Sequence, residues 1–464
     1  MSETAKQIAA GKWFLVLGTL LVASGSVSAA PPPLPSGLGG DAPPALPSGL
    51  GGEAASTAEV EESDDEANKL LPFELHGFAE LRVGGRLQNA PGFSDSSLRE
   101  ARLQLQMEEY LGASSTFKAV MDFVYDDLDP DRGFDWEDGS GWLDPRELWL
   151  STKPVDAVDL KLGRQVATWG VGDLLFINDL FPKDWNSFFL GRDLEYLKAP
   201  QDSLRASYFS DWVNLDLVYS PRFEPDRFID GQRLSFWSEA SGSLTEQAVP
   251  MDPVYPGGTF DSDELHLRLS RILGRFELAA YGYWGYWKSP AGVDTATGRA
   301  LFPELEVFGA SARGPIGSGL LSAEIGAYES VDDPAGEDPF TRNSELRLLL
   351  GYERELGNEL TGSAQYYVER TRDYAAADSV ADRDRDLVTL RLRKQLWQQT
   401  LTLNAFVFYS PSQEDHYTRL SASWKASDEW RWDVGANLFG GEDWSFFGQF
   451  GRNENLYLAA RRSF

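Results

Sequence analysis

Apolar and polar side chains alternate with a period of two along most of the chain, from Phe73 onward. In residues 101–108, Ala, Leu, Leu and Met alternate with Arg, Gln, Gln and Glu, and similar runs occupy residues 265–270, 388–393 and 401–408. Successive side chains of a β-strand point to opposite faces of a sheet. Each run therefore predicts a strand with one apolar face and one polar or aromatic face.

The alternating runs predict eighteen strands, an even number. They start near residues 73, 97, 115, 145, 157, 203, 213, 263, 276, 304, 319, 343, 359, 386, 400, 415, 429 and 455. Short links, such as residues 112–114 and 273–275, alternate with long ones, such as residues 127–144, 170–201 and 220–262. We therefore expect an all-β fold over residues 72–464: a closed antiparallel transmembrane β-barrel of about eighteen strands, with short periplasmic turns and long extracellular loops.

Composition is compatible with this fold. Hydrophobic residues make up 42% of the chain and mean hydropathy is −0.34, as in a soluble protein. A membrane barrel has the same average, because every second residue faces a wet lumen. Aromatic residues, at 13%, are numerous enough for girdles at both membrane interfaces. Closure of the barrel leaves no strand edge with unpaired backbone groups in lipid.

The first 71 residues predict an export signal and a spacer. Lys6 and Lys12 precede an apolar run of about eleven residues, too short for a membrane-spanning helix, and small residues follow at 27–29. Residues 1–29 are therefore interpreted as a signal peptide; a membrane anchor is the alternative. Residues 30–71 repeat the heptad of residues 34–40 and end in an acidic run, which predicts a disordered linker. A periplasmic binding role for this linker is the alternative.

Charge and motif content exclude several function classes. The net charge of −30, from 72 acidic and 42 basic residues, argues against a nucleic-acid partner. The chain has no cysteine and therefore no disulfide. Its three histidines, His76, His266 and His416, lie in different predicted strands without a Ser or Asp partner at motif spacing. Nucleophile-elbow, zincin and Walker motifs are also absent, so we expect neither an enzyme nor a cofactor.

The last strand alternates up to Phe464, which resembles the assembly signal of outer-membrane proteins. The expected partners are the lipid bilayer, lipopolysaccharide and the outer-membrane assembly machinery, the last contacted through this strand. The sequence leaves homo-oligomer formation open.

A second resemblance lies in a stretch of about fifty residues. The tripeptide Gly163-Arg164-Gln165 is followed by Trp169-Gly170 and by Pro182 and Asp184. This series resembles the Gly-Arg-Gln…Trp-Gly…Pro-x-Asp signature of a group of Gram-negative outer-membrane proteins. The wall of that group is similar to alginate-export channels and phosphate-selective porins. The resemblance implies an outer-membrane channel and names no substrate.

Strand phase assigns charged side chains to the lumen. Acids gather in the first seven strands and most bases in later ones, so two opposed arcs would place a transverse field across the pore. A self-neutralising solvated wall is the alternative. The predicted lining residues are Arg102, Arg205, Arg268, Arg347, Arg391, Arg393, Arg419, Glu80, Glu108, Asp122 and Glu147.

Two long links carry further candidate sites. The link at residues 171–201 is too rich in aromatic residues to lie in water, so we expect it to enter the barrel and narrow the passage; packing outside is the alternative. Its candidate constriction residues are Trp185, Phe188, Phe189, Arg192 and Lys198. In the link at residues 127–144, five aspartates approach the spacing of a calcium loop, although Gly133 comes one position late. The candidate calcium ligands, for which a hydrated acidic loop is the alternative, are Asp127, Asp129, Asp131, Asp135 and Asp138.

The sequence thus predicts a porin-like channel of the outer membrane for passive passage of small or medium hydrophilic solutes, anionic or amphipathic ones included. One alternative is an outlet for exopolysaccharide export. Another is a barrel without transport, acting as an adhesin or as a sleeve around a partner protein.

Overall fold

The computed structural model describes residues 74–129, 133–134, 141–238, 242–246, 251–374 and 383–464. The predicted signal peptide and linker lie outside the described residues, as do Asp131, Asp135 and Asp138 of the candidate calcium loop.

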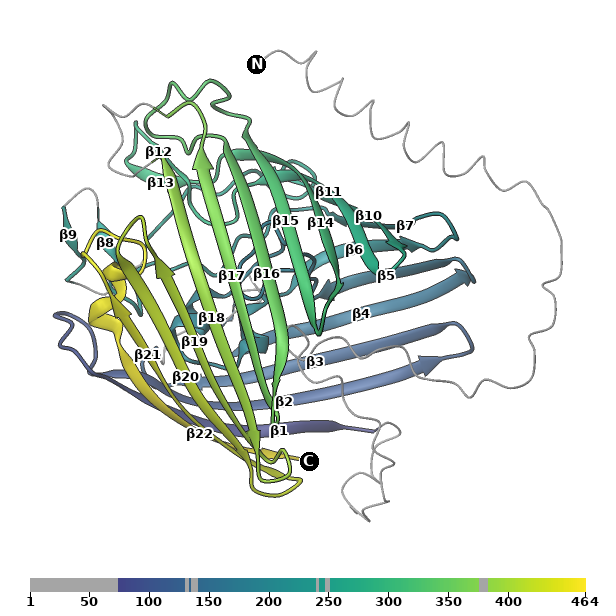
Figure 1. The fold of residues 1–464 in the computed structure, drawn as a ribbon, viewed down its shortest axis with the longest axis horizontal. Coiled ribbons are helices and arrows are strands. Elements are labelled where there is room, and N and C mark those ends of the chain that lie inside the picture. The colour runs from purple at the N-terminus through teal and green to yellow at the C-terminus, as the bar shows by residue number, and fades with distance from the viewer. Residues whose placement is uncertain (1–73, 130–132, 135–140, 239–241, 247–250, 375–382) are drawn as a thin grey trace. The chain divides into compact units, whose positions relative to one another are not determined.

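Eighteen strands form one antiparallel sheet that closes on itself (Figure 1). Each strand pairs with the next along the chain, and β1 pairs with β22 from Phe78↔Ser463 to Arg86↔Asn455. The expected fold class is therefore confirmed. The barrel strands are β1 (His76–Arg86), β2 (Ser96–Leu111), β3 (Ser115–Asp126), β4 (Leu143–Val155), β5 (Val158–Gln165), β6 (Gln201–Tyr208), β7 (Asn214–Ser220), β10 (Glu264–Leu273), β11 (Phe276–Tyr286), β14 (Glu304–Ile316), β15 (Gly319–Ser330), β16 (Glu345–Gly357), β17 (Leu360–Thr371), β18 (Asp384–Leu396), β19 (Leu401–Ser410), β20 (Asp415–Lys425), β21 (Trp430–Gly440) and β22 (Asn455–Ser463).

The other elements lie in the long connections. Two short hairpins, β8 (Trp237–Ser238) with β9 (Ser243–Leu244) and β12 (Gly292–Asp294) with β13 (Arg299–Leu301), follow β7 and β11. The helices are α2 (Trp185–Leu190), η2 (Leu194–Leu197) and η3 (Gly448–Asn453). Among the described residues, no helix combines the length and the apolar character needed to cross a bilayer.

Strand starts follow the alternating pattern closely. The largest difference is in the first strand, predicted from residue 73 and beginning at His76. Long and short connections alternate, with one departure: residues 411–414 between β19 and β20 form a tight turn at the end of the barrel where the other connections are long.

The outer face of the barrel exposes a band of large apolar side chains. Aromatic residues flank this band at both ends, as in transmembrane barrels. At the short-turn end they are Tyr110, Tyr208, Trp212, Trp397, Trp424 and Trp430, and at the long-loop end Tyr125, Trp142, Tyr366 and Tyr409. We call the apolar band between them the outer belt; it includes Leu81, Leu103, Leu150, Leu162, Leu204, Leu269, Phe308, Ile325, Leu348, Leu390, Leu392, Leu420, Val434 and Leu458.

Candidate functional site: a segment inside the barrel and the cavity above it

The connection from β5 to β6, residues 166–200, lies inside the barrel, and we call it the inserted segment. It contacts inward-facing side chains from strands around most of the sheet. Side chains on opposite walls of a closed barrel can reach one segment only through the lumen. The wall residues in contact with it are Arg82 of β1, Glu100 of β2, Arg146 of β4, Glu324 of β15, Arg391 of β18, Arg419 of β20, Arg431 of β21 and Arg461 of β22.

The first anchor of the inserted segment is on β14 and β15. The Glu324 carboxylate accepts hydrogen bonds from the backbone N–H groups of Val171 (3.1 Å) and Asn178 (2.9 Å). On the same two strands, Gly309 of β14 is paired with Gly326 of β15. A Cβ atom on Gly309 would lie 1.7 Å from Asn178 Oδ1, and one on Gly326 would lie 2.7 Å from Ile177 Cγ2. The segment therefore approaches the wall where two glycines leave space.

Replacement of Gly309 by valine is expected to displace Asn178 and lower stability. Overpacking of this kind costs about 1–3 kcal/mol, because the wall and the segment cannot both keep their positions. The midpoint of thermal unfolding in detergent measures the effect. Gly85→Val in β1 is the matched control, because no atom lies within 4 Å of its Cβ position. Equal midpoints for the two variants would contradict the close approach.

Helix α2 packs its aromatic residues against the wall. Asp184 begins the helix by accepting from the Ser187 N–H (2.7 Å), and Gly191 ends it with φ +89°. Phe188 and Phe189 are buried, and their ring centroids lie 5.4 and 5.5 Å from that of Tyr417 in β20. These two candidate constriction residues hold the helix against the wall, and both also line the cavity described below.

Asp193 is the second anchor and is surrounded by arginines. Its carboxylate accepts from Arg82 (2.8 Å), Arg461 (2.7 Å) and Arg431. Burial alone would raise the pKa of Asp193, but Arg461, Arg431 and Arg82 outweigh it and hold the pKa well below the usual range. Two further carboxylates approach Asp193, yet these guanidinium groups already neutralise the group, so it is a poor cation site.

Most of the predicted lining residues form ion pairs on the inner face. This arrangement fits the self-neutralising wall better than two opposed arcs. The pairs are Arg102–Asp122, Arg205–Asp216, Arg268–Asp216, Arg347–Glu345, Arg391–Asp173, Glu147–Lys118 and Glu80–Arg82. Glu108 lies opposite Lys118 in the β2–β3 register, Arg393 lies opposite Asn404, and Arg419 donates to the carbonyls of Phe188 and Arg192.

The remaining candidates have local partners. Trp185 Nε1 donates to Asp226 (2.9 Å), and Arg192 pairs with Glu100. The Lys198 carbonyl accepts from Arg146 (2.7 Å). In the candidate calcium loop, Asp127 pairs with Arg99 at 3.1 Å, which leaves the described part of that loop without a cluster of free carboxylates.

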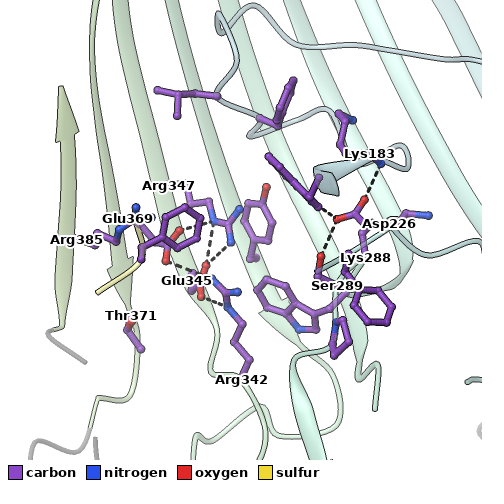
Figure 2. Close-up of a pocket in the computed structure, with 18 of the residues that line it drawn as sticks. Lys183, Asp226, Lys288, Ser289, Arg342, Glu345, Arg347, Glu369, Thr371 and Arg385 are labelled. Atoms are coloured by element: carbon purple, nitrogen blue, oxygen red, sulfur yellow. Dashed lines mark hydrogen bonds and ion pairs between the residues drawn. The ribbon is translucent and has the colours of Figure 1, made fainter. Parts of the chain in front are cut away.

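A cavity of about 950 Å³ is enclosed by the inserted segment, the long connections and the inner face of the strands, and we call it the vestibule. Aromatic and aliphatic side chains, among them Phe176, Trp185 and Phe228, line much of it. Two groups of its polar side chains are drawn on opposite sides of Figure 2. One group comes from the rim of β16 to β18 and includes Arg342, Glu345, Arg347, Glu369 and Arg385; the other consists of Lys183, Asp226, Lys288 and Ser289.

The second polar group fixes the inserted segment to its neighbouring connections. Asp226 accepts from the Lys183 N–H (2.8 Å) and from Ser289 Oγ (2.8 Å). Lys288 Nζ donates to Glu264 (2.5 Å) and to the Glu224 carbonyl (3.0 Å). This side of the vestibule is therefore a closed network of satisfied polar groups.

Glu224, in the β7–β10 connection, is expected to make stability depend on pH. Burial raises its pKa to about 7, against the attraction of Arg164. The folded protein then binds a proton between about pH 4.5 and 7 that the unfolded chain releases, so stability falls as pH rises through this window. In Glu224→Gln, the drop in unfolding midpoint between pH 5 and 8 should shrink. The exposed Asp261→Asn in the same connection serves as control; an equal pH dependence in both variants would refute the expectation.

Several residues that hold this site together were not predicted from strand phase or loop composition. Arg461 could have been predicted to face the lumen, because it alternates with the apolar residues of the last strand. Asp193, Asp226 and Lys288 lie in irregular connections without periodicity, and nothing in the local sequence marks them. Glu324 alternates like any lumen residue, and only the fold shows that it holds the inserted segment.

Comparison with known proteins gives similarity to solved porin structures. No family model matches the chain, and no curated protein does. A triple mutant of the Rhodopseudomonas blastica porin is 14% identical, covers 84% of this chain and 100% of its own, and has a TM-score of 0.40. A loop-deletion mutant of OmpT, an outer membrane protein of Vibrio cholerae, is 12% identical, covers 84% and 99%, and has a TM-score of 0.41. No residue role follows from similarities of this size.

Proposed function

We propose that this protein is an outer-membrane channel through which small or medium hydrophilic solutes, anionic or amphipathic ones included, pass down their gradients. The inserted segment narrows the passage, and the vestibule receives solutes at the long-loop end. The outer belt supports a membrane location, because so much exposed apolar surface is unfavourable in water and favourable in lipid.

One observation carries the proposal: the inserted segment is anchored to inward-facing side chains on several walls of a closed barrel. Polar and charged side chains face the lumen, as a solvated passage requires. An outlet for a charged polymer would need a wide lumen with one sign of charge. The ion pairs and the segment inside the barrel favour passage of small solutes instead.

Reconstitution of the purified protein into a planar bilayer tests the proposal. We expect discrete current steps in potassium chloride solution, with a conductance below that of an open barrel of eighteen strands. A protein that inserts into the bilayer without carrying current would contradict the channel and favour the adhesin or sleeve. Uniform selectivity for one ion sign together with a very large conductance would favour the polymer outlet.

A further inference from the structure

The vestibule has the composition of a ligand site. Its volume of about 950 Å³ lies in the range of small-molecule pockets. Such pockets combine a mostly apolar lining with a few placed polar groups. Phe176, Trp185 and Phe228 line the vestibule together with Leu174 and Met251. A passage that served only highly polar solutes would gain nothing from this apolar lining.

Arg385, a cation of the vestibule, is not ion-paired with any described residue as the arginines beside it are. Arg342 and Arg347 share the carboxylates of Glu345 and Glu369. Arg385, at the start of β18, forms no ion pair within the part of the chain that the structure describes. Figure 2 places it on the same side as these pairs.

Arg385 is nevertheless held in a defined position. Its guanidinium carbon lies 4.1 Å from the ring centroid of Phe446 and 5.9 Å from that of Phe447. Its Nε donates to Gln413 Oε1 at 3.2 Å. Stacking on an aromatic ring fixes the plane of an arginine and leaves its edge for a carboxylate. Arg383, an exposed cation two residues earlier, also lines the vestibule and adds positive potential there.

We propose that the vestibule binds amphipathic monoanions, compounds with a carboxylate on an apolar, preferentially aromatic body. The carboxylate pairs with Arg385, and the body rests on the rings around Phe176 and Trp185. This inference deepens the proposed channel function, on which it rests, by naming the class of solute that the channel retains at its mouth.

Calorimetry on the protein in lipid nanodiscs tests the proposal, with empty nanodiscs as reference. The probe is 2-naphthoate; 2-naphthalenemethanol has the same body without charge, and gluconate has the charge without an apolar body. We expect saturable binding of 2-naphthoate, weaker binding of the alcohol and no binding of gluconate. Absence of saturable 2-naphthoate binding, or gluconate binding of equal strength, overturns the proposal.

Variants identify the cation. Arg385→Gln should weaken 2-naphthoate binding at least about tenfold and leave the alcohol unchanged, because only the charged hydrogen bond is lost. Arg385→Lys keeps the charge, and its affinity for 2-naphthoate should lie between those of the natural protein and Arg385→Gln. Arg370→Gln is the matched control, since Arg370 is an exposed cation of the neighbouring strand, paired with Asp384 and outside the vestibule. Equal affinities for Arg385→Gln and Arg370→Gln overturn the assignment.

A further variant tests the apolar contact. Phe176→Ser should weaken the binding of both naphthyl compounds, and an unchanged affinity for both overturns the placement of the body.

The current measured in potassium chloride distinguishes failure of this proposal from failure of the proposed function. Binding without current refutes the channel alone, whereas current without 2-naphthoate binding refutes the site alone.

Discussion

Deletion of residues 174–190, with a short Gly-Ser bridge in their place, is expected to raise single-channel conductance at least about twofold, because the deletion opens cross-section to water and ions. The deleted stretch holds helix α2 and the apolar floor of the vestibule. None of the eighteen barrel strands includes a residue of this stretch. The measurement is the current step of single insertions in a planar bilayer.

A matched control changes an exposed turn outside the lumen. Replacement of residues 295–298, the turn between β12 and β13, by Asn-Gly shortens a rim hairpin and leaves the inserted segment intact. Its conductance should equal that of the natural protein. Unchanged conductance in the deletion variant, with the barrel correctly folded, would show that the segment does not narrow the passage.

Asp193→Ala is expected to loosen the inserted segment without unfolding the barrel. Removal of one partner from a buried ionic network costs up to about 3–5 kcal/mol. Arg82 and Arg461 keep Glu80 as a partner, and Arg431 keeps Asp433. The substitution should therefore destabilise mainly the attachment of the inserted segment. Amide hydrogen exchange should accelerate about a hundredfold in residues 187–198 and little in the strands. Open-channel current noise should rise in parallel.

The exposed Asp428→Asn, in the turn between β20 and β21, is the matched control for the loss of one carboxylate. It should leave both exchange and noise unchanged. An Asp193→Ala protein whose residues 187–198 exchange as slowly as in the natural protein would show that other contacts hold the segment.

The wall of the barrel was predictable from local sequence. In a strand with one face to lipid and one to water, consecutive residues are by turns apolar and polar, as Leu392 and Arg393 are. This alternation identifies the strand and its two faces. The closing pair β1–β22 was also within reach, because an even number of antiparallel strands with no free edge requires it.

The interior was less accessible, because its contacts join residues far apart in the chain. The aromatic content of residues 171–201 predicted burial, yet the positions of Asn178 and Asp193 depend on Glu324, 146 residues after Asn178, and on Arg461 in the last strand. Likewise, Arg385 is distinguished by its contact with Phe446 and by forming no ion pair with the described residues, and both properties depend on the folded neighbourhood.

Single-cysteine accessibility tests the central claim most directly, since the chain has no cysteine of its own. That claim is that side chains alternately face lipid and a water-filled lumen. Leu392→Cys and Arg393→Cys are neighbours on β18, with Leu392 in the outer belt. In reconstituted liposomes, a charged methanethiosulfonate should react with the cysteine at position 393 and spare the one at 392. Equal or reversed reactivity would contradict a membrane barrel with this register.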